Sequence, residues 1–324
     1  MDDVRWFASN DYTALVVPPL RRQGLTVATE GDAPARVALA MSGLAAEAAW
    51  SFAQRHGTRL VVYLWDLPPV GTGSGRADPV WWVGGRFLRL PRPWGGYGRR
   101  RGYYSRLRYI SARADAVWAA STLTCETIAE RFGVEAIRLP YCYDSIRFRP
   151  RPADAPRAEP PVLLTVSRLR RHKNQAAVIE AAASLDRPVR VRLIGRGEEA
   201  GALAALARRL RVTCSVETSA DDATVDRAYH EASVAVCPSR FEGFGLTPIE
   251  AVASGVPVVA SDIPPHREYV GPAARLVAID DVPALAAGIR AALTASPADH
   301  SLVADLTIAA AATRFLSALD PFLG

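Results

Sequence analysis

Residues 238–251 read Pro-Ser-Arg-Phe-Glu-Gly-Phe-Gly-Leu-Thr-Pro-Ile-Glu-Ala, a glycine-rich turn followed by an apolar stretch. A short apolar run, 234–237, precedes the turn, and another, 256–260, comes after the apolar stretch. This pattern predicts a strand, a tight turn, a helix and a further strand. In that arrangement, free main-chain N–H groups gather at the N-terminus of the helix and attract phosphate.

Two acidic residues, Glu242 and Glu250, bracket this turn at a spacing of eight residues. Eight residues make about two helical turns, so both carboxylates are expected on one side of the element. A turn that binds phosphate between two carboxylates would suit a nucleotide-sugar, with N–H groups for the diphosphate and acids for hydroxyls. The alternative is an ordinary helix start with two solvated glutamates.

The basic residues point to a second part of the same site. The chain has 39 of them, and all but Lys173 are arginine. A lysine carries a compact point charge that an arginine does not reproduce, although chance could also leave one lysine behind. Arg168 and Lys173 lie between a predicted buried strand, 162–166, and a predicted alanine-rich helix, 175–185. Ligands bind at such strand-to-helix loops in open parallel sheets.

Three segments resemble a known family when they are taken together. They are Ser-Arg-Leu-x-x-x-Lys-Asn from residue 167, Leu-Ile-Gly-Arg-Gly from 193, and Pro-Ser-x-x-Glu-Gly-Phe-Gly-Leu-x-x-x-Glu-Ala from 238. In order and spacing they resemble the donor-binding half of glycosyltransferase family four, over residues 160–300. The resemblance implies a retaining enzyme of the GT-B fold. This is an α/β fold in which two Rossmann-like domains face each other across a cleft.

The resemblance also implies roles for individual residues. Arg168 and Lys173 would neutralise the donor diphosphate, and Glu250 would hold the ribose hydroxyls. Glu242 would hold the sugar and phosphate together with the N–H groups of Phe244, Gly245, Leu246 and Thr247. Gly195 would let its loop pass close to the nucleotide.

Length and proline distribution predict two domains. Six prolines fall between Pro140 and Pro161, and they predict a stiff connector at 146–161. Residues 1–145 would form the acceptor-side domain and residues 162–301 the donor-binding domain. In similar proteins the last helix, here about 302–320, crosses back onto the N-terminal domain. On both sides of the connector, apolar runs alternate with helical patterns, as βαβ units do. The predicted strands are 4–8, 25–29, 37–40, 60–64, 116–119, 162–166, 189–194, 213–216, 234–237, 256–260 and 275–278.

The N-terminal half departs from the family pattern at two places. Relatives carry a glycine pair in the first strand-to-helix loop, where this chain has Asn10 and Asp11, whose side chains offer hydrogen bonds instead. Relatives also carry His-Asp after the fourth strand, where this chain has Trp65 and Asp66. Asp66 is expected to orient or deprotonate the acceptor hydroxyl. The alternative is that Asp66 caps the segment that follows.

Residues 79–114 contain no acid, nine arginines and eight aromatic residues. Arginine mixed with aromatic side chains suits docking on an anionic membrane surface, or binding of a phosphorylated acceptor. The same mixture could bind nucleic acid by charge and stacking, but the stretch lacks any known nucleic-acid module. A loop whose arginines reflect composition alone is the remaining alternative.

The resemblance implies a hexosyltransferase that uses a nucleotide-diphosphate sugar as co-substrate and has no other cofactor. The acceptor would be a glycan, a lipid-linked sugar or a small molecule. No metal is expected, because the cations replace a metal clamp and the dispersed His and Asp offer no site. The alternatives are another GT-B activity, such as epimerisation or sugar-phosphate transfer, and a non-catalytic nucleotide-sugar-binding subunit. Without a signal-peptide core, an uninterrupted membrane span or paired cysteines, a cytoplasmic protein is expected, with peripheral membrane contact as one option.

Overall fold

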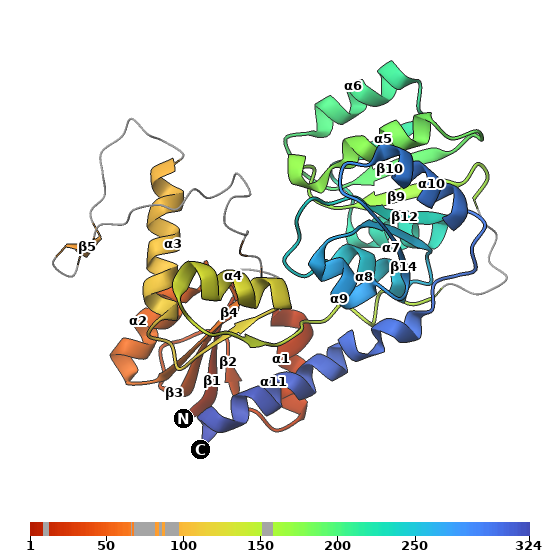
Figure 1. The fold of residues 1–324 in the computed structure, drawn as a ribbon. Helices are drawn as coiled ribbons and strands as arrows, with labels where there is room; N and C mark the ends of the chain where they lie inside the picture. The colour runs from red at the N-terminus through yellow and green to blue at the C-terminus, as the bar shows by residue number, and fades with distance from the viewer. Residues whose placement is uncertain (9–12, 66, 68–81, 84–85, 88–96, 151–157) are drawn as a thin grey trace. The chain divides into compact units, whose positions relative to one another are not determined.

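The computed structural model describes residues 1–324 apart from 9–12, 66, 68–81, 84–85, 88–96 and 151–157. The chain divides into two units: unit 1 comprises Met1–Tyr141 and Ala311–Gly324, and unit 2 comprises Cys142–Ala310. Each unit carries a six-stranded sheet in which every pair of neighbouring strands is parallel (Figure 1). The predicted α/β class with two Rossmann-like domains is confirmed.

The sheet of unit 1 has the strand order β2-β1-β3-β4-β7-β8. These strands are β1 (Asp2–Phe7), β2 (Val27–Ala28), β3 (Ala35–Ala40), β4 (Arg59–Leu64), β7 (Ala116–Ala119) and β8 (Ile137–Arg138). The helices of this unit are α1 (Thr13–Arg22), α2 (Ala46–His56), α3 (Tyr97–Ser111), α4 (Thr122–Phe132) and part of α11 (Ile308–Leu323). A separate antiparallel pair joins β5 (Trp82–Val83) to β6 (Arg86–Phe87).

Both faces of this sheet are buried, which explains the continuous apolar runs in its strands. In β4, Val62 and Leu64 join the cluster that contains Phe52 of α2. The side chain of Tyr63 points to the opposite face, where its ring lies 5.7 Å from that of Phe315 in α11. The period of two along the strand therefore assigns alternate residues to two different helical layers.

Most of the C-terminal helix, from Ala311 onward, belongs to unit 1, and the bounds of the helix differ from those predicted. The expected helix at 302–320 is two elements, the 3₁₀ helix η2 (His300–Leu306) and α11, and they meet at Thr307. Phe315 of α11 is fully buried, and its ring packs against the rings of Trp6, Trp118 and Tyr141 as well as Tyr63. Arg314 donates hydrogen bonds to the carbonyls of Pro140 and Tyr141.

One helical stretch of the described residues, His300–Phe322, is long and apolar enough to cross a membrane when judged by length and composition alone. Within it, Ala311, Ala312, Phe315 and Leu319 are fully buried in the core of the protein. Core helices of globular domains pass the same test.

The sheet of unit 2 has the order β11-β10-β9-β12-β13-β14. Its strands are β9 (Val162–Val166), β10 (Arg190–Ile194), β11 (Cys214–Glu217), β12 (Val234–Cys237), β13 (Val258–Ser261) and β14 (Ala274–Val277). All six predicted strands of this half are present, within two residues of the predicted bounds. The helices are α5 (Gln175–Ala183), α6 (Ala200–Leu210), α7 (Asp222–Glu231), α8 (Leu246–Ala253), α9 (Pro264–Val270) and α10 (Val282–Ala292). Of these, α5, α6 and α10 share one apolar cluster with the sheet.

The strand order of unit 2 creates a point at which the chain changes direction. From β9 the chain proceeds outward through β10 and β11, and it then returns to place β12 on the other side of β9. The loops that leave β9 and β12 therefore diverge to opposite sides. In open parallel sheets, ligands bind outside the carboxyl ends of the strands at this switch point.

Residues 97–111 of the arginine-rich segment 79–114 form a helix. The alternative prediction of a loop is therefore wrong for these residues. α3 begins at Tyr97, and Leu107 and Ile110 on it are buried in the core of unit 1. Arg106 pairs with Glu47 at 3.4 Å, and the Arg113 guanidinium lies 3.7 Å from the Tyr109 ring centroid. These contacts assign structural roles to part of the segment, and membrane docking stays a prediction.

Candidate functional site

The loop after β9 carries the predicted cations. Its backbone is fixed by Gln175, whose Nε2 donates to the Ser167 hydroxyl and to the Arg168 carbonyl, both at 2.9 Å. A 3₁₀ turn, η1 (Arg171–Lys173), then delivers the chain to α5. The Arg168 side chain is exposed and has no hydrogen bond or ion pair with any described residue. Its guanidinium is therefore available to a ligand.

Lys173 and Glu242 form an ion pair across the switch point. Lys173 Nζ lies 2.6 Å from Glu242 Oε1, and the side chains are only 12% and 16% exposed. The Ser239 hydroxyl donates to the same oxygen at 2.7 Å. Within the described part of the chain, Glu242 Oε2 has no partner. Glu242 thus holds Lys173 with one oxygen and keeps the other for a further donor.

The ion pair also sets the charge state of Glu242. Burial alone would raise the pKa of this carboxyl, but attraction to Lys173 and the hydrogen bonds from Lys173 and Ser239 outweigh it. The net effect is a pKa below the ordinary value. Glu242 is therefore an anion at neutral pH and accepts hydrogen bonds only.

Helix α8 begins at Leu246, four residues after Glu242, without a side-chain cap. Its N-cap residue is Gly245, which offers no side-chain acceptor to the first turn. The first N–H groups of a helix have no partner within the helix, so those of Leu246 and Thr247 remain available. The helix dipole adds positive potential at the same end. The Thr247 hydroxyl donates to the Val166 carbonyl at 2.8 Å and so fixes α8 to the end of β9.

Gly245 is required by its conformation and by its neighbour His266. Its φ of 89° disfavours any residue with a side chain, and a Cβ there would lie 3.1 Å from His266 Cδ2. His266 is 1% exposed, and its Nδ1 donates to the Ser261 carbonyl at 2.9 Å. In the neutral ring Nε2 is therefore the unprotonated nitrogen. It is buried beneath the glycine turn and has no hydrogen-bond partner in the described structure. Burial lowers the pKa of His266, which keeps the ring neutral at pH 7.

Glu250 lies farther along α8 and has a different environment. The Tyr229 hydroxyl of α7 donates to Glu250 Oε2 at 3.0 Å. Burial raises the pKa of Glu250 to about 7, although Tyr229 and Arg147 act in the opposite direction. The two acids of the motif therefore differ: Glu242 stays ionised, and Glu250 changes charge near neutral pH.

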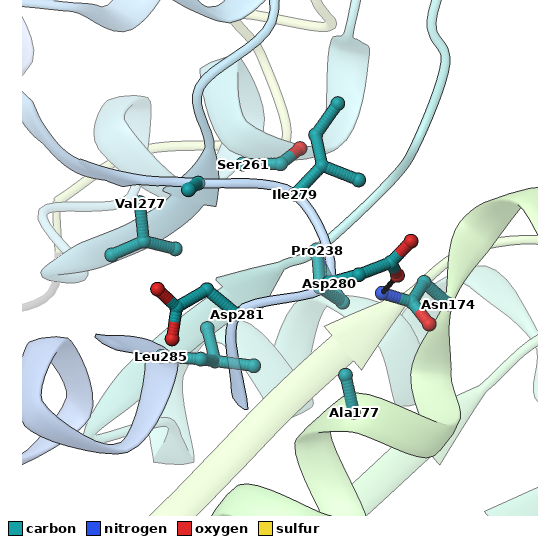
Figure 2. Close-up of a pocket in the computed structure, with 10 residues that line it drawn as sticks. Asn174, Ala177, Pro238, Ser261, Val277, Ile279, Asp280, Asp281 and Leu285 are labelled. Carbon is teal, nitrogen blue, oxygen red and sulfur yellow. Dashed lines mark hydrogen bonds between the residues drawn. The ribbon is translucent and has the colours of Figure 1, made fainter. Parts of the chain in front are cut away.

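Asp280 and Arg240 hold the loop after β9 and the loop after β12 together. Asp280 accepts from Asn174 at 3.1 Å and from Arg240 at 2.9 Å (Figure 2 shows the bond to Asn174). Arg240 also donates from Nη1 to the Arg171 carbonyl and from its main-chain N–H to the His172 carbonyl. The cavity beside Asp280 measures only about 10 Å³, which is the size of one water. The cavity is therefore too small to hold a nucleotide-sugar.

Gly195 has a packing role that the sequence did not reveal. A Cβ at this position would lie 1.9 Å from the Ser167 carbonyl oxygen, a clash between two backbones. The absence of a side chain therefore lets the loops after β9 and β10 lie in direct contact. Phe244 is also committed to packing, since its ring meets Tyr269 edge-on at 4.6 Å and is 5% exposed.

Few of the predicted acceptor-side residues can be placed. Asn10, Asp11 and Asp66 lie outside the described residues. Trp65 is described, and its indole N–H donates to the Met41 carbonyl while its ring lies 4.3 Å from that of Tyr141. Trp65 therefore packs at the end of β4, and its role toward an acceptor stays a prediction.

Sequence reasoning missed the residues that orient the site. Tyr229 and Asp280 lie outside the quoted motifs, and Arg240 occupies an unspecified position of one of them. All three meet their partners only through the fold. Tyr229 is 21 residues from Glu250 along the chain, and Asp280 is 106 from Asn174. Among the described residues, no group of three His, Cys, Asp or Glu side chains converges as a metal site would require.

Comparisons with known proteins show which families and folds this chain resembles. Residues 148–305 match the family model described as "Glycosyl transferases group 1". A glycogen synthase of Mycobacterium tuberculosis is 32% identical over 197 residues, which cover 59% of this chain and 44% of that protein. A phosphatidyl-myo-inositol mannosyltransferase of Mycolicibacterium smegmatis is 33% identical over 189 residues, covering 53% and 46%. The chain thus spans less than half the length of these curated relatives.

Solved structures extend the similarity of fold to both units. HepE of Anabaena, in complex with UDP-glucose, superposes with a TM-score of 0.72 at 17% identity, over 98% of this chain and 91% of HepE. Sucrose-phosphate synthase from Thermosynechococcus elongatus gives a TM-score of 0.63 at 20% identity, over 89% and 71%. The match to the family model thus covers residues 148–305, and the chain has the two-domain α/β fold of GT-B glycosyltransferases.

Proposed function

We propose that this protein is a retaining glycosyltransferase that moves a hexose from a nucleotide-diphosphate sugar to an acceptor hydroxyl. The observation that carries the proposal is the group of charges at the switch point of unit 2. There the Lys173–Glu242 pair adjoins the uncapped start of α8, and Glu250 lies farther along the same helix. The UDP-glucose bound by HepE, a protein of the same fold, supports a donor of this class.

The donor diphosphate would lie between Arg168, Lys173 and the N–H groups of Leu246 and Thr247. Arg168 is exposed and without a partner among the described residues, so its guanidinium can bind an anionic ligand. Arginine binds phosphate in a fork, while the lysine ammonium acts as a point charge. Glu242 Oε2 would accept a hydroxyl of the sugar, and the carboxylate of Glu250 would accept those of the ribose.

In this proposal, catalysis rests on stabilising the leaving group. The bond between the anomeric carbon and the phosphate oxygen breaks, and its electron pair stays on the diphosphate. The acceptor oxygen bonds to the same face of the anomeric carbon, and its proton passes to the departing phosphate. Negative charge therefore grows beside Lys173 and Arg168, where fixed cations lower the barrier most.

A divalent metal is not required in this scheme, because the two cations and the helix N-terminus neutralise the diphosphate. The acceptor would bind unit 1, with Asp66 orienting its hydroxyl, and a glycan, a lipid-linked sugar or a small molecule would each suit. The location proposed is the cytoplasm, with contact to an anionic membrane surface through residues 79–114. An excess of EDTA should leave turnover unchanged, and loss of turnover that Mg²⁺ restores would contradict metal independence.

The donor is tested first with a thermal-shift panel of UDP-glucose, GDP-mannose and dTDP-glucose. A ligand at 100 times its Kd stabilises the native state by about 2.7 kcal/mol, which corresponds to a rise in Tm of about 5 °C. We expect one base to give such a rise. No response to any member of the panel would contradict a nucleotide-sugar site.

Slow hydrolysis of the bound donor then separates an enzyme from a non-catalytic binding subunit. We expect the wild-type chain to release nucleoside diphosphate and free sugar, and Glu242→Ala to abolish the release. Binding without release, and without transfer to any acceptor, would favour the subunit. NMR of the first product formed should show the anomeric configuration of the donor, and the opposite anomer would contradict retention.

A further inference from the structure

Tyr229 is a buried residue of the site to which the proposed chemistry gives no role. It is 1% exposed, and its ring meets that of Phe148 edge-on at 5.3 Å and an interplanar angle of 81°. This packing fixes the ring and therefore the direction of its hydroxyl. That hydroxyl lies 3.0 Å from Glu250 Oε2.

The bond between these residues has a defined direction. An ionised carboxylate has no proton to give, so the Tyr229 hydroxyl donates and Glu250 accepts. Burial raises the pKa of the Tyr229 hydroxyl well above its ordinary value, and the proximity of Glu250 adds to this, so Tyr229 keeps its proton. The bond fixes one oxygen of Glu250. The other, Oε1, has no partner within the described part of the chain.

We propose that Tyr229 is a positioning residue that aims Glu250 at the ribose hydroxyls of the donor and makes the site selective for ribonucleotides over 2′-deoxyribonucleotides. This inference rests on the proposed function, in which Glu250 binds the ribose. With Oε2 held by Tyr229, Oε1 faces the hydroxyls as an oriented acceptor. A nucleotide without the 2′-hydroxyl cannot donate that hydrogen bond to Oε1, and it therefore binds with lower affinity.

The charged groups around Glu250 set the pH range in which this selectivity operates. Asp144 and Asp226 favour the protonated form of Glu250, whereas Arg147 and Tyr229 favour the ionised form. Arg147 itself is held by Asp226 at 2.7 Å and by Asp222 at 3.1 Å, so its position is fixed. Because the pKa of Glu250 is about 7, the ionised form increases between pH 6 and pH 8.

The test compares UDP with dUDP, or GDP with dGDP if the panel selects guanine, by calorimetry on the full chain. Both members of a pair carry the same diphosphate, so the deoxy compound controls for phosphate ionisation. For the wild type at pH 8 we expect about tenfold tighter binding of the ribonucleotide. Lowering the pH to 6 should reduce that ratio to about twofold.

Tyr229→Phe removes one hydroxyl and keeps the ring that packs on Phe148. We expect it to lower the ratio at pH 8 to about twofold and to move the pH midpoint upward, since Glu250 loses a donor that favours its ionised form. In a Glu250→Gln background the same substitution should change the ratio no further. Equal losses for UDP and dUDP, with the ratio kept, would show a merely structural role and overturn the inference.

The wild-type measurement keeps the inference falsifiable should Tyr229→Phe fold poorly. A ratio of one at pH 8, or a ratio that does not change with pH, contradicts it without any variant. A response to dTDP-glucose alone in the panel also contradicts it, because dTDP lacks the 2′-hydroxyl. Failure of the proposed function is a different result, namely that wild type binds neither nucleotide. Binding of both with equal affinity overturns only the role of Tyr229 and Glu250 at the ribose.

Discussion

The ammonium of Lys173 and the carboxylate of Glu242 lie 2.6 Å apart although 69 residues separate them in the chain. The two residues come from the loops after β9 and β12, which are neighbouring strands in the sheet of unit 2. The sole lysine of the chain is thus paired with the first acid of the glycine-rich motif. A ligand at this point meets both members of the pair at once.

The first prediction concerns the stability of this pair. Lys173→Ala leaves Glu242 as an unpaired anion, and loss of one partner from a fully buried pair costs about 3–5 kcal/mol. Because both side chains keep some exposure, we expect a loss of about 2 kcal/mol in the free energy of unfolding. Urea denaturation measures it. The double variant Lys173→Ala/Glu242→Gln should recover most of the loss, and an equally unstable double variant would contradict the explanation.

The second prediction uses the raised pKa of Glu250. Because its pKa is about 7 in the folded state against an ordinary 4.5, the folded chain holds a proton that the unfolded chain releases between these values. Stability from this group therefore falls as pH rises from 4.5 to 7. Glu250 keeps some exposure, so we expect a decrease of about 2 kcal/mol. Glu250→Gln should lack this decrease, and a pH dependence that matches the wild type would contradict the assignment.

The third prediction concerns the glycine turn. Gly245→Ala places a Cβ 3.1 Å from His266 Cδ2 at a φ of 89°, and left-handed backbone with a side chain costs about 1–3 kcal/mol. We expect the turn to shift, with a lower Tm and at least tenfold weaker binding of the donor. Gly201→Ala, on the surface of α6 with open space around its Cβ, is the matched control. Donor affinity in Gly245→Ala equal to that of the control would contradict a role for the turn.

The fourth prediction concerns the clamp of Asp280. Its side chain and that of Arg240 are 54% and 42% exposed, so the ion pair itself contributes at most about 1 kcal/mol to stability. Asp280→Ala should therefore melt close to wild type and yet loosen the contact between the Arg168–Lys173 loop and the loop after β12, because Arg240 loses the carboxylate that orients it. We expect at least a fivefold decrease in turnover. Asp281→Asn, which keeps an N-cap acceptor for α10, is the control. Unchanged turnover in Asp280→Ala would mean that the loops hold their positions without the clamp.

The strands of unit 2 could be read from the sequence because each is a short, buried, apolar run bounded by turn residues. The region of the site could be read as well, since parallel strands present their loops at one edge of the sheet. The direct pairing of Lys173 with Glu242 could not be predicted from the sequence. The sequence placed the cations opposite the acids, and only the strand order brings these two side chains within reach of each other.

Other features escaped sequence reasoning for identifiable physical reasons. The ten-residue helix α1 contains Pro18 and Pro19, which disfavour a helix interior, but Val16, Val17 and Leu20 pack against the core and outweigh that preference. Tyr229 lies on an amphipathic helix, where a tyrosine suggests only packing. Its partner Glu250 lies on another helix, so the hydrogen bond between them cannot be predicted from a local sequence pattern.

The central claim is that the charges at the switch point cleave an activated sugar, and Lys173 tests it most directly. The measurement is the rate of donor hydrolysis by the full chain, with Arg171→Ala as a control that removes an exposed charge from the same loop. Loss of one fixed group that stabilises the leaving charge costs a factor of about 10² to 10³. We predict such a decrease for Lys173→Ala and less than a twofold change for Arg171→Ala. Hydrolysis at the wild-type rate by folded Lys173→Ala would contradict the account.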